Sequence, residues 1–194
     1  NAGRIIVGVS GASGAAYARR ALEALRAAGV ETHLVISKAA EMAMSYELGE
    51  KARDFAALAD HSYAINDVGA PISSGSFRTL GMLIAPCSVR TMSEIATGVT
   101  TSLLTRAADV VLKERRRLVL MVRETPLHLG HLRTMTALAE MGAIIAPPVP
   151  AFYAEPQTLD DIVDQTVGRA LDLFGIETPL AKRWGEDLEK GRRS

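Results

Sequence analysis

Cysteine is almost absent from this chain, whose 194 residues contain a single one, Cys87. One cysteine cannot form an intramolecular disulfide, and no cysteine pair is present to hold zinc or an iron–sulfur cluster. Because structural disulfides belong to oxidising compartments, we expect a cytoplasmic protein. Cys87 follows a predicted buried strand and has no histidine near it in sequence, so we interpret it as a small core residue rather than a nucleophile.

A net charge and long apolar runs are also missing. The 22 Lys and Arg residues cancel the 22 Asp and Glu residues, so no overall field directs the chain to nucleic acid or to an anionic membrane. No apolar stretch approaches the ~18 residues that span a bilayer. The apolar start, Ile5 to Val7, runs into glycines instead of a signal-peptide core, so we expect neither a membrane span nor export.

The composition that is present is that of a folded globular protein, with 48% hydrophobic and 23% charged residues. At about 150 residues per domain, this length predicts one domain over residues 1–194. The end of the chain is mostly charged, and we expect a flexible tail from about residue 187 to residue 194.

Short apolar runs alternate with helical patterns along the chain. The runs predicted to be buried strands are Ile5 to Val7, Thr32 to Ile36, Met82 to Ala85, Leu118 to Val122 and Ala143 to Ala146. This alternation predicts an α/β fold: a single Rossmann-like (flavodoxin-like) domain, with a parallel sheet and helices on both faces. Ligands of such folds bind at the carboxyl ends of the strands, where polar turns follow the predicted strands here.

Two of these turns have the composition of an anion or flavin site. The segment from Gly8 to Gly14 links a strand to a helix, and its glycines allow a ligand to approach the backbone at the helix N-terminus. It lacks the glycines of the dinucleotide fingerprint, so an ordinary tight turn is an equal alternative. Ser88 and Thr91 open a later helix and are placed to bond a phosphate or a ring edge.

Two further groups of side chains are candidates for chemistry. Glu124, His128 and His131 have i, i+4 and i+7 spacing on a predicted helix whose first turn is Thr125-Pro126. Such spacing is compatible with a metal site, but no other ligand is in view. Thr158 and Asp161 predict a capped helix whose apolar stripe excludes Arg169. Arg169 and Tyr153, which follows a proline-rich loop, are therefore candidates for holding a small phosphate.

Taken in order, these motifs resemble the UbiX family of flavin prenyltransferases, within the flavin-containing cysteine decarboxylase-like folds. The resemblance runs from Arg4 to Trp184. It is carried by the blocks Gly8 to Gly14, Ser37 to Ala40, Ser73 to Ser76, Pro86 to Ser88, Arg106 to Arg115, Arg123 to Leu127 and Pro148 to Tyr153.

The resemblance implies an enzyme that joins a dimethylallyl group from dimethylallyl monophosphate to N5 and C6 of reduced FMN, without a metal. Prenylated FMN is the cofactor of UbiD-type decarboxylases, the implied recipients. The family also implies a homo-oligomer, a dodecamer built from trimers, with sites at the subunit interfaces.

The resemblance also assigns roles to residues of this chain. The residues that it implies hold FMN are Gly11, Ala12, Ser13, Ser37, Ser88, Val89, Arg90, Thr91 and Arg123. The residues implied to be catalytic are Ser13, Glu47, Lys113 and Glu124, and those implied to bind the prenyl phosphate are Arg106, Lys113, Tyr153 and Arg169. Of these, Arg106 and Glu124 are implied to come from neighbouring subunits.

Two other functions stay open at this point. An FMN-dependent cysteine-type decarboxylase would need a catalytic histidine soon after the second strand, where this chain has Ser37-Lys38-Ala39. A non-catalytic FMN-binding accessory subunit of an aromatic acid decarboxylase would need a flavin pocket but no second phosphate site. The presence of Lys113, Tyr153 and Arg169 favours the enzyme.

Overall fold

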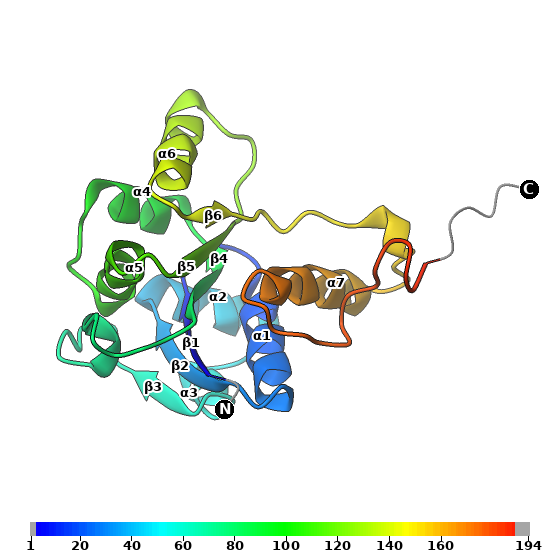
Figure 1. Cartoon of the computed structure of the whole chain (residues 1–194), viewed down its shortest axis with the longest axis horizontal. Helices are drawn as coiled ribbons and strands as arrows, with labels where there is room; N and C mark the ends of the chain where they lie inside the picture. The colour runs from blue at the N-terminus through cyan, green and yellow to red at the C-terminus, as the bar shows by residue number, and fades with distance from the viewer. Residues whose placement is uncertain (1–2, 189–194) are drawn as a thin grey trace, which may run out of the picture.

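Residues 3–188 are described by a computed structural model, in which one sheet is covered by helices on both faces (Figure 1). The sheet has the strand order β3-β2-β1-β4-β5-β6, and every pairing is parallel. Its strands are β1 (Arg4–Val9), β2 (Glu31–Ile36), β3 (His61–Tyr63), β4 (Gly81–Cys87), β5 (Arg117–Val122) and β6 (Ile144–Ile145). The α-helices are α1 (Ala15–Ala27), α2 (Lys38–Leu48), α3 (Ala52–Ala56), α4 (Val89–Thr97), α5 (Leu103–Lys113), α6 (Leu129–Glu140) and α7 (Leu159–Asp172).

Successive side chains of a strand point to opposite faces of the sheet, and each face has its own hydrophobic core. In β1, Ile5 and Val7 belong to one buried cluster, whereas Ile6 belongs to the other, as the two-residue period of a strand requires. Helices α1, α2, α3 and α7 contribute to the first cluster, and α4, α5 and α6 to the second. The predicted α/β fold, with its parallel sheet and helices on both faces, is confirmed.

The order in which the strands are added reverses between β1 and β4, which are neighbours in the sheet although they are distant in sequence. Crevices at such switch points are where doubly wound folds bind their ligands. Here the two strand ends are tied together by Ser10, which is 1% exposed. Its hydroxyl donates to the Pro86 carbonyl over 2.9 Å and accepts from the Ser88 amide over 2.8 Å. Ser10 thereby fixes the turns after β1 and β4 relative to each other.

Strand β3 and the start of α6 differ from the sequence prediction. Strand β3 was not predicted, because it is a three-residue edge strand of sequence His-Ser-Tyr without an apolar run. The predicted helix start at Thr125-Pro126 is also wrong, because α6 begins at Leu129. His128 caps that helix, and its ring accepts the His131 amide over 3.2 Å. Glu124 therefore lies outside the helix, and the spacing argument for a metal site with the two histidines does not hold.

The chain beyond β6 runs away from the sheet, turns through a 3-10 helix, η2 (Phe152–Ala154), and returns as α7 along α1 (Figure 1). Another 3-10 helix, η1 (Pro71–Ser73), lies between β3 and β4. Among residues 3–188, no helix combines the length and the apolar character needed to cross a membrane. Most of the predicted flexible tail, from residue 189 onward, lies outside the described residues.

Candidate functional site

A cavity of about 550 Å³ opens at the carboxyl ends of the strands, beside the switch point. Its walls come from the turns that follow β1, β2, β4 and β5. All the residues predicted to hold the flavin line it: Gly11, Ala12, Ser13, Ser37, Ser88, Val89, Arg90, Thr91 and Arg123. The structure thus gathers them at one place, whereas their contacts with a ligand stay a prediction. Glu124 lines the same cavity in the same chain.

Helices α2 and α4 point their N-termini into this cavity, and serines cap both. The Ser37 hydroxyl accepts the Ala40 amide, and the Ser88 hydroxyl accepts the Thr91 amide, each over 3.1 Å. Within residues 3–188, the amides of the first two residues of each helix have no hydrogen-bond partner. Free amides at the positive end of a helix dipole are suited to an anionic group.

Helix α1 also begins at this edge, but its amides are already bonded. The carboxylate of Glu47, from the last turn of α2, accepts the Gly14 amide over 2.9 Å and the Ala15 amide over 3.3 Å. A carboxylate at a helix N-terminus is stabilised by the helix dipole. Glu47 was predicted to be catalytic. The structure places it beside the turn that contains Ser13, outside the lining of the cavity, so an external anion is directed to α2 and α4.

The turn after β1 and the start of α2 are in close contact. A Cβ atom on Gly11 would lie 2.3 Å from the Cβ of Ala39, and one on Gly8 would lie 2.5 Å from a methyl carbon of Leu104. Such distances are far inside van der Waals contact. The Leu104 side chain could shift to admit a larger residue at position 8, whereas the Ala39 Cβ is fixed by its backbone, so position 11 requires glycine. Gly11 therefore brings the backbone of this turn against the start of α2, at the wall of the cavity.

A second cavity, of about 270 Å³, lies between β6, the proline-rich loop and α7. Two residues that were predicted to bind the prenyl phosphate, Tyr153 and Arg169, line it. Its other walls are largely apolar and include Met121, Ala146 and Leu173. The buried Gln165, which the sequence analysis missed, donates to the Tyr153 hydroxyl over 3.4 Å. A polar, cationic end beside apolar walls is suited to a small organic phosphate.

The two cavities are built from different parts of the sequence, which meet at β5. The residues that line the first cavity lie between Gly11 and Glu124, and those that line the second lie between Met121 and Leu173. Strand β5 contributes Met121 to the second cavity, and the turn after β5 contributes Arg123 to the first.

Arg106 and Lys113 line neither cavity. Both lie on α5, where Lys113 pairs with Glu114 over 2.8 Å and Arg106 with Asp109 over 3.4 Å. Within one chain Lys113 thus lies apart from Tyr153 and Arg169, and its role at the phosphate stays a prediction.

Cys87 is fully buried, and burial raises the pKa of its thiol to about 12. The interpretation as a core residue is confirmed, because a buried neutral thiol is neither nucleophilic nor a ready metal ligand. We expect iodoacetamide at pH 8 to leave Cys87 of the folded protein unmodified, and activity unchanged. Intact-mass measurement checks this, with the denatured chain as the control that does react. Rapid alkylation of the folded protein would contradict it.

Comparison with known proteins decides the family. A family model described as Flavoprotein matches residues 1–171. The UbiX flavin prenyltransferase of Escherichia coli strain K12 is 60% identical over 184 residues, which cover 93% of this chain and 97% of that protein. The chain belongs to the UbiX flavin prenyltransferase family.

Solved structures of the UbiX family match over nearly the whole chain. The crystal structure of AnUbiX in complex with FMN and dimethylallyl pyrophosphate has a TM-score of 0.92 and 50% identity, covering 94% of this chain and 97% of that one. A dodecameric FMN-dependent UbiX-like decarboxylase from E. coli O157:H7 has a TM-score of 0.91 and 53% identity, covering 93% and 98%. The fold of this chain is that of the family, whose named activity makes it an enzyme of the transferase class.

Proposed function

We propose that this chain joins a dimethylallyl group, taken from dimethylallyl monophosphate, to N5 and C6 of reduced FMN. One observation carries the proposal: a cavity with free helix N-termini coexists with a separate cavity that contains Tyr153 and Arg169. Because Met121 and Arg123 of one strand end reach the two cavities, the two sites are neighbours. The prenylated FMN would then serve UbiD-type decarboxylases.

The first cavity fits FMN by the chemistry of its donors. The free amides of α2 and α4, with the hydroxyls of Ser37 and Ser88, are suited to its phosphate, and the glycine turn leaves room beside the backbone for its ring. Arg123 adds a positive charge at the mouth of the cavity. When bound, reduced FMN supplies the electron-rich ring atoms that accept the prenyl group.

The second cavity fits the donor. Breaking the allylic carbon–oxygen bond leaves the electron pair, and hence negative charge, on the phosphate oxygen. The Arg169 guanidinium and the Tyr153 hydroxyl are placed to stabilise that charge as it develops. Binding the donor beside the flavin also supplies the proximity and orientation that the reaction requires. We assign Ser13 to the flavin side of the site, and Glu47 to proton transfer from its position beside the Ser13 turn.

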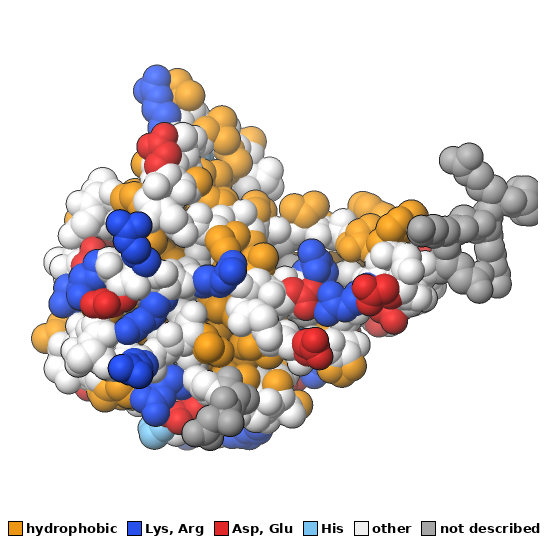
Figure 2. All heavy atoms as spheres, in the orientation of Figure 1, with side chains coloured by type: hydrophobic (Ala, Val, Ile, Leu, Met, Phe, Trp, Pro, Cys, Tyr) orange, Lys and Arg blue, Asp and Glu red, His pale blue; other side chains and the backbone are white. Residues whose placement is uncertain are grey.

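A complete site needs more than one copy of the chain. Lys113 and Arg106 lie outside both cavities, so their proposed roles at the phosphate require a neighbouring subunit. Figure 2 shows hydrophobic side chains exposed over α6 and along the chain toward η2. They include Leu129 at 59% exposure and Phe152 at 81%, an apolar area typical of a subunit interface. These features support a dodecamer like that of the E. coli O157:H7 relative.

Mass spectrometry of the flavin tests the proposal. We expect the protein, incubated anaerobically with reduced FMN and dimethylallyl monophosphate, to yield FMN heavier by one dimethylallyl unit. Samples without donor, or with dimethylallyl pyrophosphate in its place, are the controls for transfer and for donor preference. Unchanged flavin on folded, FMN-loaded protein with both donors would favour the alternative, a non-catalytic accessory subunit.

A further inference from the structure

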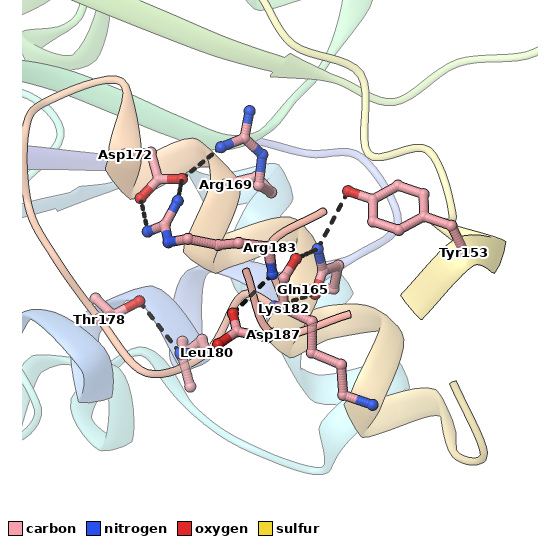
Figure 3. Close-up of polar contacts among 9 residues, drawn as sticks. All are labelled: Tyr153, Gln165, Arg169, Asp172, Thr178, Leu180, Lys182, Arg183 and Asp187. Atoms are coloured by element: carbon pink, nitrogen blue, oxygen red, sulfur yellow. Dashed lines mark hydrogen bonds and ion pairs between the residues drawn. The ribbon is translucent and has the colours of Figure 1, made fainter. Parts of the chain in front are cut away.

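Arg169 belongs to a charged trio with Asp172 and Arg183, which connects α7 to the segment that follows it (Figure 3). The Arg169 Nη1 donates to Asp172 Oδ2 over 2.5 Å. Arg183 binds both carboxylate oxygens, with Nη1 donating to Oδ2 over 3.0 Å and Nη2 donating to Oδ1 over 2.8 Å. One carboxylate therefore holds two guanidinium groups, and only one of them lines the cavity assigned to the prenyl phosphate.

The carboxylate of this trio stays charged. The hydrogen bond from Arg183 holds the pKa of Asp172 below its ordinary value, and the same bond raises the pKa of Arg183. The Asp172 side chain is 17% exposed, whereas that of Arg169 is 56% exposed. The anion is thus largely covered by protein, and the cation that faces the cavity is open to a ligand.

The net charge of the trio depends on both arginines. If Asp172 bonded Arg169 alone, the two charges would cancel and a phosphate would meet a neutral pair. Among the three side chains that are directly bonded, two guanidinium cations and one carboxylate leave one net positive charge. Glu186 and Asp187 also act on Arg183, and they lie on its own segment rather than in the cavity lining.

A second contact fixes Arg183 in place. The buried amide side chain of Gln165 accepts the Lys182 backbone amide over 2.8 Å and donates to the Lys182 carbonyl over 3.1 Å. Because Lys182 directly precedes Arg183, this pair of bonds holds the backbone where the Arg183 side chain can reach Asp172. The same Gln165 nitrogen donates to the Tyr153 hydroxyl, so both proposed phosphate ligands are connected to one segment of the chain (Figure 3).

We propose that Arg183 is a positioning residue for the donor phosphate: it neutralises Asp172, so that Arg169 keeps a free positive charge directed at the phosphate. This inference rests on the function proposed above for the second cavity. It assigns Arg183 no contact with the donor, since Arg183 does not line that cavity.

Steady-state kinetics of the Arg183→Gln protein test the inference, with dimethylallyl monophosphate as the varied substrate and saturating reduced FMN. We expect KM for the donor to rise about fivefold to tenfold, the size of one weakened charge-assisted contact, while kcat changes less than about twofold. FMN content should equal that of the parent. Arg183→Lys keeps the charge and should retain most of the parent affinity. Should the glutamine variant not fold, Arg183→Met keeps the aliphatic stem and carries the same expectation.

A double variant separates charge balance from structural support. In Arg183→Gln/Asp172→Asn the unbalanced anion is gone, so KM should return to within about twofold of the parent value. Arg20→Gln is the matched control. Arg20 of α1 pairs over 2.6 Å with Asp164, which lies on α7 like Asp172, and it lines no part of the second cavity. Its side chain is 36% exposed, close to the 32% of Arg183. The donor KM of this control variant should stay at the parent value.

Three results would overturn the inference: an unchanged KM in Arg183→Gln, a raised KM that Asp172→Asn does not restore, or an equal rise in the Arg20→Gln control. A parent protein that forms no prenylated flavin would instead contradict the proposed function itself.

Discussion

Arg169→Ala is expected to lower kcat/KM for the prenyl donor about 10- to 100-fold while FMN stays bound. A guanidinium that grips a phosphate supplies a charge-assisted contact of about 1.5–3 kcal/mol, and its loss should affect the donor alone. The reason for the selectivity is geometric, since Arg169 lines the second cavity and not the first. Bound FMN is measured by absorbance after desalting, and prenylated product by mass spectrometry.

Tyr153→Phe and an arginine control complete this experiment. The phenylalanine removes one hydroxyl from the same cavity, so it should reduce transfer less than Arg169→Ala does. Arg53→Ala is the control, because Arg53 is exposed on α3 and lines neither cavity. If the Arg169 variant lost its FMN while folded, or prenylated at the parent rate, the phosphate site would lie elsewhere.

Gly11→Ala should empty the flavin cavity and destabilise the fold. The added Cβ would lie 2.3 Å from the Ala39 Cβ, and 3.3 Å from the Ala39 carbonyl carbon, so either the turn or the start of α2 must move. Overpacking of this kind costs about 1–3 kcal/mol, and for a chain of this size each kcal/mol lowers Tm by about 2–4 °C. Thermal unfolding by circular dichroism and flavin absorbance after desalting measure the two effects.

Gly69→Ala is the matched control for the Gly11 variant. Gly69 does not have a positive φ, and the nearest atom to an added Cβ there is 3.6 Å away, which is ordinary contact. It should keep both Tm and FMN content. Parent-like flavin binding by Gly11→Ala would show that the close approach of the two turns is dispensable.

Most of the fold could be predicted because the central strands are buried on both faces and appear as apolar runs that end at polar residues, glycine or proline. Strand β3 lacked that signal, since an edge strand of three polar and aromatic residues looks like a loop. The predicted start of α6 was wrong for a different reason. Proline is tolerated in the first turn of a helix, but it does not require one, and the His128 side chain sets the boundary instead.

The walls of the first cavity could also be predicted from the sequence, because parallel strands bring the turns at their carboxyl ends to one edge of the sheet. Which side chain bonds the amides at each helix N-terminus could not be predicted. Glu47 lies 33 residues from the Gly14 amide that it bonds, and no local pattern predicts such a pairing. The same holds for Gln165 and Arg183, whose importance comes from contacts between α7 and the chain beyond it. The resemblance to the UbiX family supplied the roles of Lys113 and Arg106, which geometry within one chain does not.

The division of the two cavities along the chain has a consequence for protein engineering. Residues up to Glu124 build the first cavity, and residues from Met121 to Leu173 build the second, with β5 as the shared boundary. A chimera that crosses over directly after Glu124 would therefore exchange the walls around the donor, apart from Met121, while it retains every residue that lines the flavin cavity. Donors with longer or bulkier isoprenoid tails could be accommodated by grafting the later segment from a relative, without redesigning the nucleotide-binding half.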